Sequence, residues 1–79
     1  MELITVNELA VKCGTTYHTV NFYINIGLLR VVERKGNKRF LKRTSAVTTM
    51  KKVMTLRKEG FPLQMIVKHI EGQIKINMN

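Results

Sequence analysis

The fold is decided by residues 5–27, TVNELAVKCGTTYHTVNFYINIG. Thr5 and Glu8 have the spacing of a capping box, in which a threonine hydroxyl and a glutamate carboxylate each bond a free amide at a helix start. Apolar residues follow at helical spacing as far as Gly14, which can take the left-handed conformation that ends a helix. The segment therefore predicts a short first helix over about residues 6–13.

A second helix is predicted directly after this glycine. Thr15 and Thr16 supply hydroxyls that can cap it, and Gly27 is placed to end it near Ile26. Its apolar side comprises Val20, Tyr23 and Ile24. Two short helices joined by a tight turn are thus expected in the first third of the chain.

The next segment predicts a β-hairpin. A β-rich stretch begins at Val31-Val32, turns at Gly36-Asn37 and returns through residues 38–41. A loop of this kind would set Lys35 opposite Lys38, Arg34 opposite Arg39, and Val32 opposite Leu41. Like charges directly opposed destabilise a hairpin, so these pairs favour strands that hold phosphate oxygens.

Two more helices are predicted beyond the hairpin. The first covers about residues 46–59, with Thr44 or Ser45 as its cap. The second begins at Pro62, which suits the first turn of a helix, and runs to about Glu71. Their apolar sides comprise Val47, Met50, Val53, Met54 and Leu56 in the first, and Leu63, Ile66, Val67 and Ile70 in the second.

The length of 79 residues allows one small core. We expect one domain over residues 1–72 and a tail over residues 73–79. The tail is expected to be a linker or the start of a dimerisation segment. Apolar runs are far shorter than the roughly 20 residues of a membrane span, and the N-terminus lacks the pattern of an export signal. A cytoplasmic, nucleoid-associated protein without a membrane partner is expected.

The charge points to a polyanionic partner. The chain has 14 Lys and Arg against 5 Asp and Glu, a net charge of +9. Eleven of the basic residues lie between positions 30 and 58, where Glu33 is the single acid. Nucleic acid explains such clustering better than a merely solvated face does. A lone cysteine, Cys13, provides neither an internal disulfide nor a zinc site, so no metal or cofactor is expected.

Together these features predict a winged helix-turn-helix, mainly α with a small β-hairpin wing and four helices. Ala10, Gly14 and Val20 have the offsets of a helix-turn-helix, in which a small residue, a turn and an apolar filler let two helices pack. The second helix, about residues 16–26, is expected in the major groove of double-stranded DNA. The wing, about residues 31–41, is expected along the backbone.

Candidate DNA contacts follow from this placement. Asn21 can pair with N6 and N7 of adenine, whereas Arg39 is expected to hold phosphate. The candidates on or beside the second helix are Thr15, Thr16, Tyr17, His18, Asn21 and Tyr23. Those of the wing and the residues after it are Arg34, Lys35, Asn37, Lys38, Arg39, Lys42 and Arg43. No catalytic residues are expected: His18 and His69 lie far apart in sequence, and neither a carboxylate pair nor a phosphate-cradling glycine loop is present.

Several motifs resemble the DNA-binding domain of MerR-family transcription regulators over about residues 3–71. They are Glu8-Leu9-Ala10, Cys13-Gly14, Thr19-Val20-Asn21-Phe22-Tyr23, Ile26-Gly27-Leu28-Leu29, Gly36-Asn37-Lys38-Arg39-Phe40 and Leu56-Arg57-Lys58-Glu59-Gly60-Phe61-Pro62-Leu63. The resemblance implies that the second helix is the recognition helix, that the hairpin is the wing, and that the last two helices add positively charged contacts. Asn21-Phe22-Tyr23-Ile24 departs from the usual Arg-Tyr-Tyr-Glu, so a basic residue and a tyrosine hydroxyl that commonly serve DNA contacts are missing.

Sequence-specific DNA binding as a bacterial or phage transcription regulator is the function expected first. A small accessory DNA-binding factor for recombination or for plasmid or phage maintenance is the alternative. A winged-helix adaptor for protein interactions is a further alternative, although it predicts weaker basic clustering. The sequence leaves open the target site and whether the chain forms a homodimer or assembles cooperatively on DNA.

Overall fold

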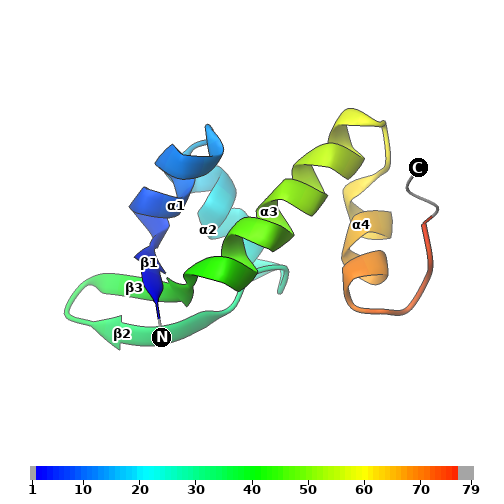
Figure 1. Ribbon diagram of the computed structural model, residues 1–79. Helices are drawn as coiled ribbons and strands as arrows, with labels where there is room; N and C mark the ends of the chain where they lie inside the picture. Colours follow the sequence, from blue (N-terminus) through cyan, green and yellow to red (C-terminus); the bar gives the residue numbers. More distant parts are fainter. Residues whose placement is uncertain (1, 77–79) are drawn as a thin grey trace.

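The computed structural model describes residues 2–76, which form four helices and a three-stranded sheet (Figure 1). In chain order the elements are β1 (Leu3–Thr5), α1 (Val6–Cys13), α2 (Tyr17–Asn25), β2 (Val31–Lys35), β3 (Lys38–Lys42), α3 (Arg43–Lys58) and α4 (Leu63–Ile70). The predicted winged helix with four helices is confirmed. One strand, β1, was not predicted.

The first two helices begin and end where the sequence predicts. The Thr5 amide donates to Glu8 Oε1 at 2.9 Å, and the Glu8 amide donates to Thr5 Oγ1 at 3.1 Å, which completes the capping box. Gly14 ends α1 with φ of +68°, a left-handed conformation that other residues adopt only at a cost. Thr16 caps α2 by accepting from the Thr19 amide at 3.2 Å. Local hydrogen bonding therefore accounts for the helix-turn-helix.

The sheet has the order β1-β3-β2, with both strand pairs antiparallel. β1 pairs along the outer edge of β3, from Leu3 opposite Lys42 to Thr5 opposite Phe40. A three-residue strand carries too little periodicity to be predicted alone. It forms because β3 presents a free edge, and because Ile4 on β1 is buried in the core.

The hairpin register agrees with prediction near the turn and differs farther from it. Lys35 lies opposite Lys38 and Arg34 opposite Arg39, as expected. The predicted pairing of Val32 with Leu41 is wrong, because Leu41 pairs with Val31 and the register shifts between Val31 and Glu33. The extra residue of this bulge leaves Val32 47% exposed.

The predicted start of the third helix is also wrong. We expected a helix from about residue 46 capped by Thr44 or Ser45, but α3 begins at Arg43, directly after β3, without a side-chain cap. The Arg43 amide instead donates to the Glu2 carbonyl at 3.1 Å. The chain preceding β1 thus supplies the acceptor that a capping hydroxyl would otherwise provide.

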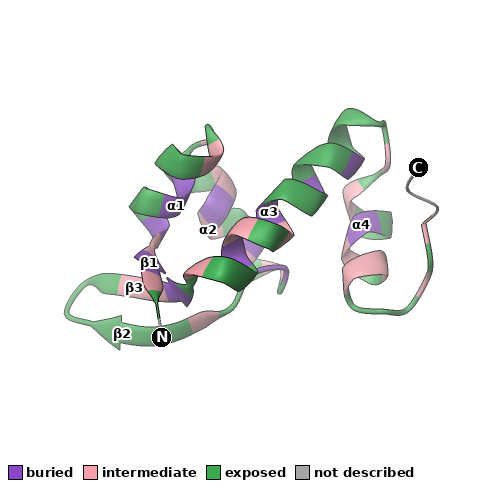
Figure 2. Ribbon diagram, in the orientation of Figure 1, coloured by how far each residue is buried: buried purple, intermediate pink, exposed green. Residues whose placement is uncertain are grey.

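Most of the core lies where α1, α2, α3 and the inner face of the sheet meet, and it continues along α3 to α4, as the purple segments of Figure 2 show. Met54, expected on the apolar side of α3, is instead 39% exposed. In α4 only Ile66 is buried, and its other predicted apolar residues are half-buried. The buried residues are Ile4, Val6, Leu9, Ala10, Val20, Tyr23, Leu28, Leu29, Leu41, Ala46, Met50, Val53, Leu56 and Ile66.

The long helix α3 extends from the sheet to α4, at the opposite end of the molecule from the hairpin turn (Figure 1). After α4, part of the predicted tail folds back: the Gln73 amide donates to the Lys68 carbonyl at 2.8 Å, and the Ile76 amide donates to His69 Nδ1 at 3.2 Å. The rest of the predicted tail, residues 77–79, lies outside the described residues.

Replacing Thr5 with alanine should lower the free energy of unfolding by about 1 kcal/mol, because the Glu8 amide loses its capping acceptor. Thr44→Ala is the matched control. Thr44 makes no capping bond, so its removal should leave the free energy of unfolding unchanged or slightly raised, since alanine favours a helix. Urea denaturation followed by circular dichroism measures both variants. Equal losses would contradict the role assigned to Thr5.

Acid should weaken the same cap. Hydrogen bonding by the Thr5 amide, and then by its side chain, lowers the pKa of Glu8 from the usual 4.5. The resulting stabilisation is complete above the unfolded-state pKa and is lost as the pH falls through the folded-state pKa. Below about pH 4.5 the wild type should therefore lose stability more steeply than Glu8→Gln, whose amide keeps the contact without titrating. Urea midpoints measured across this range would refute the account if the two profiles were parallel.

Candidate nucleic-acid interface

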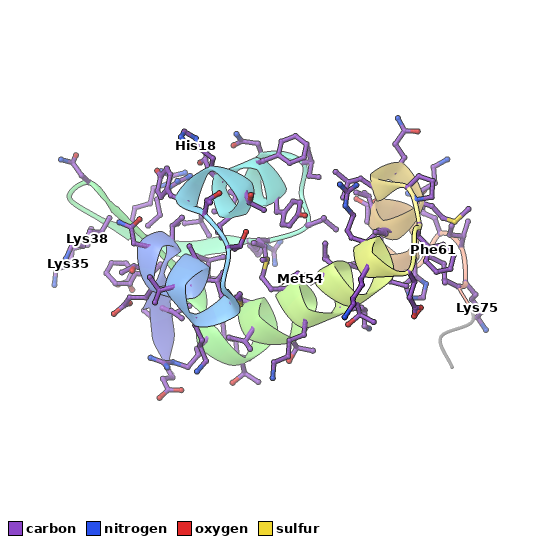
Figure 3. All side chains as sticks on the ribbon, turned by 90° about the horizontal axis from the view of Figure 1, so that it is seen from above. His18, Lys35, Lys38, Met54, Phe61 and Lys75 are labelled. Carbon is purple, nitrogen blue, oxygen red and sulfur yellow. The ribbon has the colours of Figure 1, made fainter. Side chains whose placement is uncertain are left out.

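The helix α2 presents a polar face at its N-terminal end. His18 is exposed and lies on the outer side of α2 in Figure 3, while Tyr17 is 44% exposed. Asn21, one turn farther along, is half-buried, as is Thr15 in the preceding turn. Tyr17 and Asn21 were predicted to lie on one face of α2. The structure confirms this, because both side chains contact the same residue of the hairpin.

That shared partner is Arg39, on β3. Its Nη2 donates to the Tyr17 hydroxyl at 2.8 Å and to Asn21 Oδ1 at 2.8 Å. The guanidinium carbon also lies 5.8 Å from the centre of the Tyr17 ring, within range of a cation–π attraction. One side chain therefore joins the wing to α2.

The direction of Arg39 follows from the strand geometry. Successive side chains of a strand point to opposite faces, so Arg39 and Leu41 share one face of β3. Leu41 is buried in the core, and Arg39 therefore points toward the helices rather than away from them. The repulsion expected between Arg34 and Arg39 is offset within the chain, because the Arg39 cation already has two oxygen partners.

The end of the wing carries exposed positive charge. Arg34, Lys35 and Lys38 are exposed, together with Asn37 in the turn. Lys35 and Lys38 extend from the far end of the hairpin in Figure 3. A hollow of about 270 Å³ lies between this end, the start of α1 and the start of α2; its lining residues are Thr5, Val6, Asn7, Glu8, Tyr17, Asn37, Lys38 and Arg39.

Three predicted contact residues are engaged elsewhere. Tyr23, predicted as a DNA contact, is only 8% exposed and packs in the core. The Thr16 hydroxyl caps α2 and donates to the hydroxyl of Thr19 at 3.1 Å. Arg43 Nε lies 3.3 Å from a carboxylate oxygen of Glu2, so Arg43 forms an ion pair at the N-terminal end of β1.

The basic residues that cluster in the sequence separate in space into two groups. One group lies on the hairpin, and Lys42, at the end of β3, is exposed beside it. The other group is exposed along the second half of α3, which leads away from the hairpin (Figure 1). Its members are Lys51, Lys52, Arg57 and Lys58.

The site offers polar and cationic groups rather than metal ligands. Within residues 2–76 there is no group of three or more His, Cys, Asp or Glu side chains that could hold a metal ion. Partial burial raises the pKa of the Cys13 thiol, which disfavours the reactive thiolate. In that same part of the chain, every helix is too short or too polar to cross a membrane.

The link between Arg39 and Asn21 was missed in the sequence, where the two residues were assigned separate roles. The signal that could have revealed it is the alternation of Arg39 with Leu41 on one strand. Once Leu41 is placed in the core, strand geometry directs Arg39 toward α2. The partner on α2 depends on how the sheet packs against that helix, which no local pattern encodes.

Comparisons with known proteins agree with this geometry. A family model described as "MerR HTH family regulatory protein" matches residues 4–73. No curated protein and no solved structure gives a significant match to the chain. The matched region extends from β1 past α4 and includes both the helix-turn-helix and the wing. The chain therefore belongs to the MerR helix-turn-helix family of DNA-binding regulatory proteins.

Proposed function

We propose that this protein binds double-stranded DNA sequence-specifically as a transcription regulator, with α2 in the major groove and the β2–β3 hairpin as its wing. The observation that carries the proposal is the contact of Arg39 with Tyr17 and Asn21. It holds the polar face of α2 beside the basic hairpin, so that one surface offers both base-reading groups and cations. Such a pairing is what a winged helix needs to bind a groove and its flanking backbone together.

The two parts of this surface have different roles in the proposal. Tyr17, His18 and Asn21 face base edges, where donors and acceptors differ among base pairs. Lys35 and Lys38, exposed at the end of the hairpin, face phosphates, which repeat regardless of sequence. The net charge of +9 favours association with the polyanionic backbone of DNA.

Binding should weaken steeply with salt, because each phosphate contact releases condensed counterions. About four to six such contacts give a slope of roughly −4 to −5 in a plot of log affinity against log salt concentration. Fluorescence anisotropy of a labelled duplex across a salt series measures the slope. An affinity that stays constant from low to moderate salt would refute the electrostatic interface.

Asn21→Ala and Lys38→Ala should weaken DNA binding in different ways. Asn21→Ala should lose about 1–3 kcal/mol of preference for a selected duplex over a scrambled one, with an unchanged salt slope. Lys38→Ala should weaken binding to both duplexes alike and reduce the slope by about one. Titration of both variants against both duplexes makes the comparison. Unchanged preference in Asn21→Ala would move base reading to Tyr17 or His18.

A further inference from the structure

The hydrogen bonds of Arg39 determine which polar groups α2 has left to offer. A guanidinium Nη2 carries two hydrogens, and here one goes to the Tyr17 hydroxyl and the other to Asn21 Oδ1. Both α2 side chains therefore act as acceptors within the protein. The bond to Asn21 is partly buried, which strengthens it relative to one in water.

The groups that remain are donors. Asn21 keeps the two hydrogens of Nδ2, Tyr17 keeps its O–H hydrogen, and Arg39 keeps the hydrogens on Nε and Nη1. Within residues 2–76 these hydrogens have no further protein partner. The cluster of Tyr17, Asn21 and Arg39, which we name the donor cluster, thus combines these remaining donors with a positive charge.

Only one base presents two adjacent acceptors in the major groove. Guanine offers N7 and O6, whereas adenine pairs its N7 with an N6 donor, cytosine offers an N4 donor, and thymine offers one acceptor beside a methyl group. We propose that the donor cluster selects guanine at the base pair it faces. This inference rests on the proposed function, because it requires α2 to lie in the major groove.

The proposal replaces the expectation that Asn21 reads adenine. A bidentate contact with adenine needs Oδ1 to accept from N6 while Nδ2 donates to N7. In this structure Oδ1 already accepts from Arg39 at 2.8 Å. The Arg39 cation beside it also disfavours the approach of a second donor. Removing Arg39 should therefore restore the ability of Asn21 to pair with adenine.

Selection of duplexes from a random library, followed by sequencing, tests the proposal. The wild type should enrich guanine over adenine about tenfold at the position facing α2. Arg39→Met should lose this enrichment and shift toward adenine. Lys35→Met is the matched control: it also removes one wing cation, but Lys35 is exposed and lies beside the turn, so affinity should fall for all sequences without a change in base preference.

A second variant keeps Arg39 in place. In Asn21→Asp one carboxylate oxygen can still accept from Arg39, while the two Nδ2 donors of Asn21 are replaced by an acceptor. Its preference should move from guanine to cytosine, whose N4 group donates. Circular dichroism melts establish that each variant is folded, and this variant tests the proposal independently if Arg39→Met is not folded.

The outcomes separate the proposal from the function on which it rests. If the wild type binds no duplex in preference to another, the proposed function fails. If it binds selectively but without guanine opposite α2, the donor cluster is refuted and the function stands. The same holds if Arg39→Met lowers affinity while guanine enrichment persists, since Arg39 would then contact only phosphate. A shift toward adenine in Arg39→Met together with a shift toward cytosine in Asn21→Asp supports the proposal.

Discussion

The pairing of β3 with both of its neighbours is the constraint on which the rest of this structure depends. β3 is the central strand, bonded to β1 on one edge and to β2 on the other. The alternation of its side chains sends Leu41 into the core and Arg39 toward α2. Its C-terminal end leads directly into α3, whose first amide is satisfied by the Glu2 carbonyl at the N-terminal end of β1. Core, wing and the long helix are thus positioned by one five-residue strand.

Arg39 connects β3 to the polar face of α2. Most cations of this chain, whose net charge is +9, are exposed to solvent. Arg39 is partly buried, and its two short hydrogen bonds offset the loss of contact with water. Charged hydrogen bonds of this kind are stronger than neutral ones, and they restrict the rotamers of both partners. In the proposed function, the polar face of α2 is consequently organised before DNA binds, which reduces the entropy that binding would otherwise cost.

The sequence predicted those parts of the fold that local interactions decide. The capping box of Thr5 and Glu8 and the left-handed Gly14 depend on neighbouring residues, so α1 and α2 were placed correctly. β1 and the start of α3 depend on contacts between the N-terminal residues and the end of β3, which lie about 40 positions apart in the sequence. β1 was therefore missed, and the start of α3 was misplaced. Among the candidate site residues, Tyr17 and the lysines of the hairpin are exposed, whereas Asn21 is half-buried. Tyr23 belongs to the core, and the role of Arg39 emerges only from the packing of the sheet against α2.

The central claim is that the wing and α2 read DNA as one unit joined through Arg39. A double-mutant cycle measures this most directly, using the free energy by which each protein prefers a selected duplex over a scrambled one. Wild type, Asn21→Ala, Arg39→Met and the double variant complete the cycle. Residues that act through a shared hydrogen bond should be non-additive, with a coupling energy of about 1 kcal/mol or more. Losses that simply add, to within about 0.3–0.5 kcal/mol, would show that Asn21 and Arg39 contact DNA independently and would contradict the account.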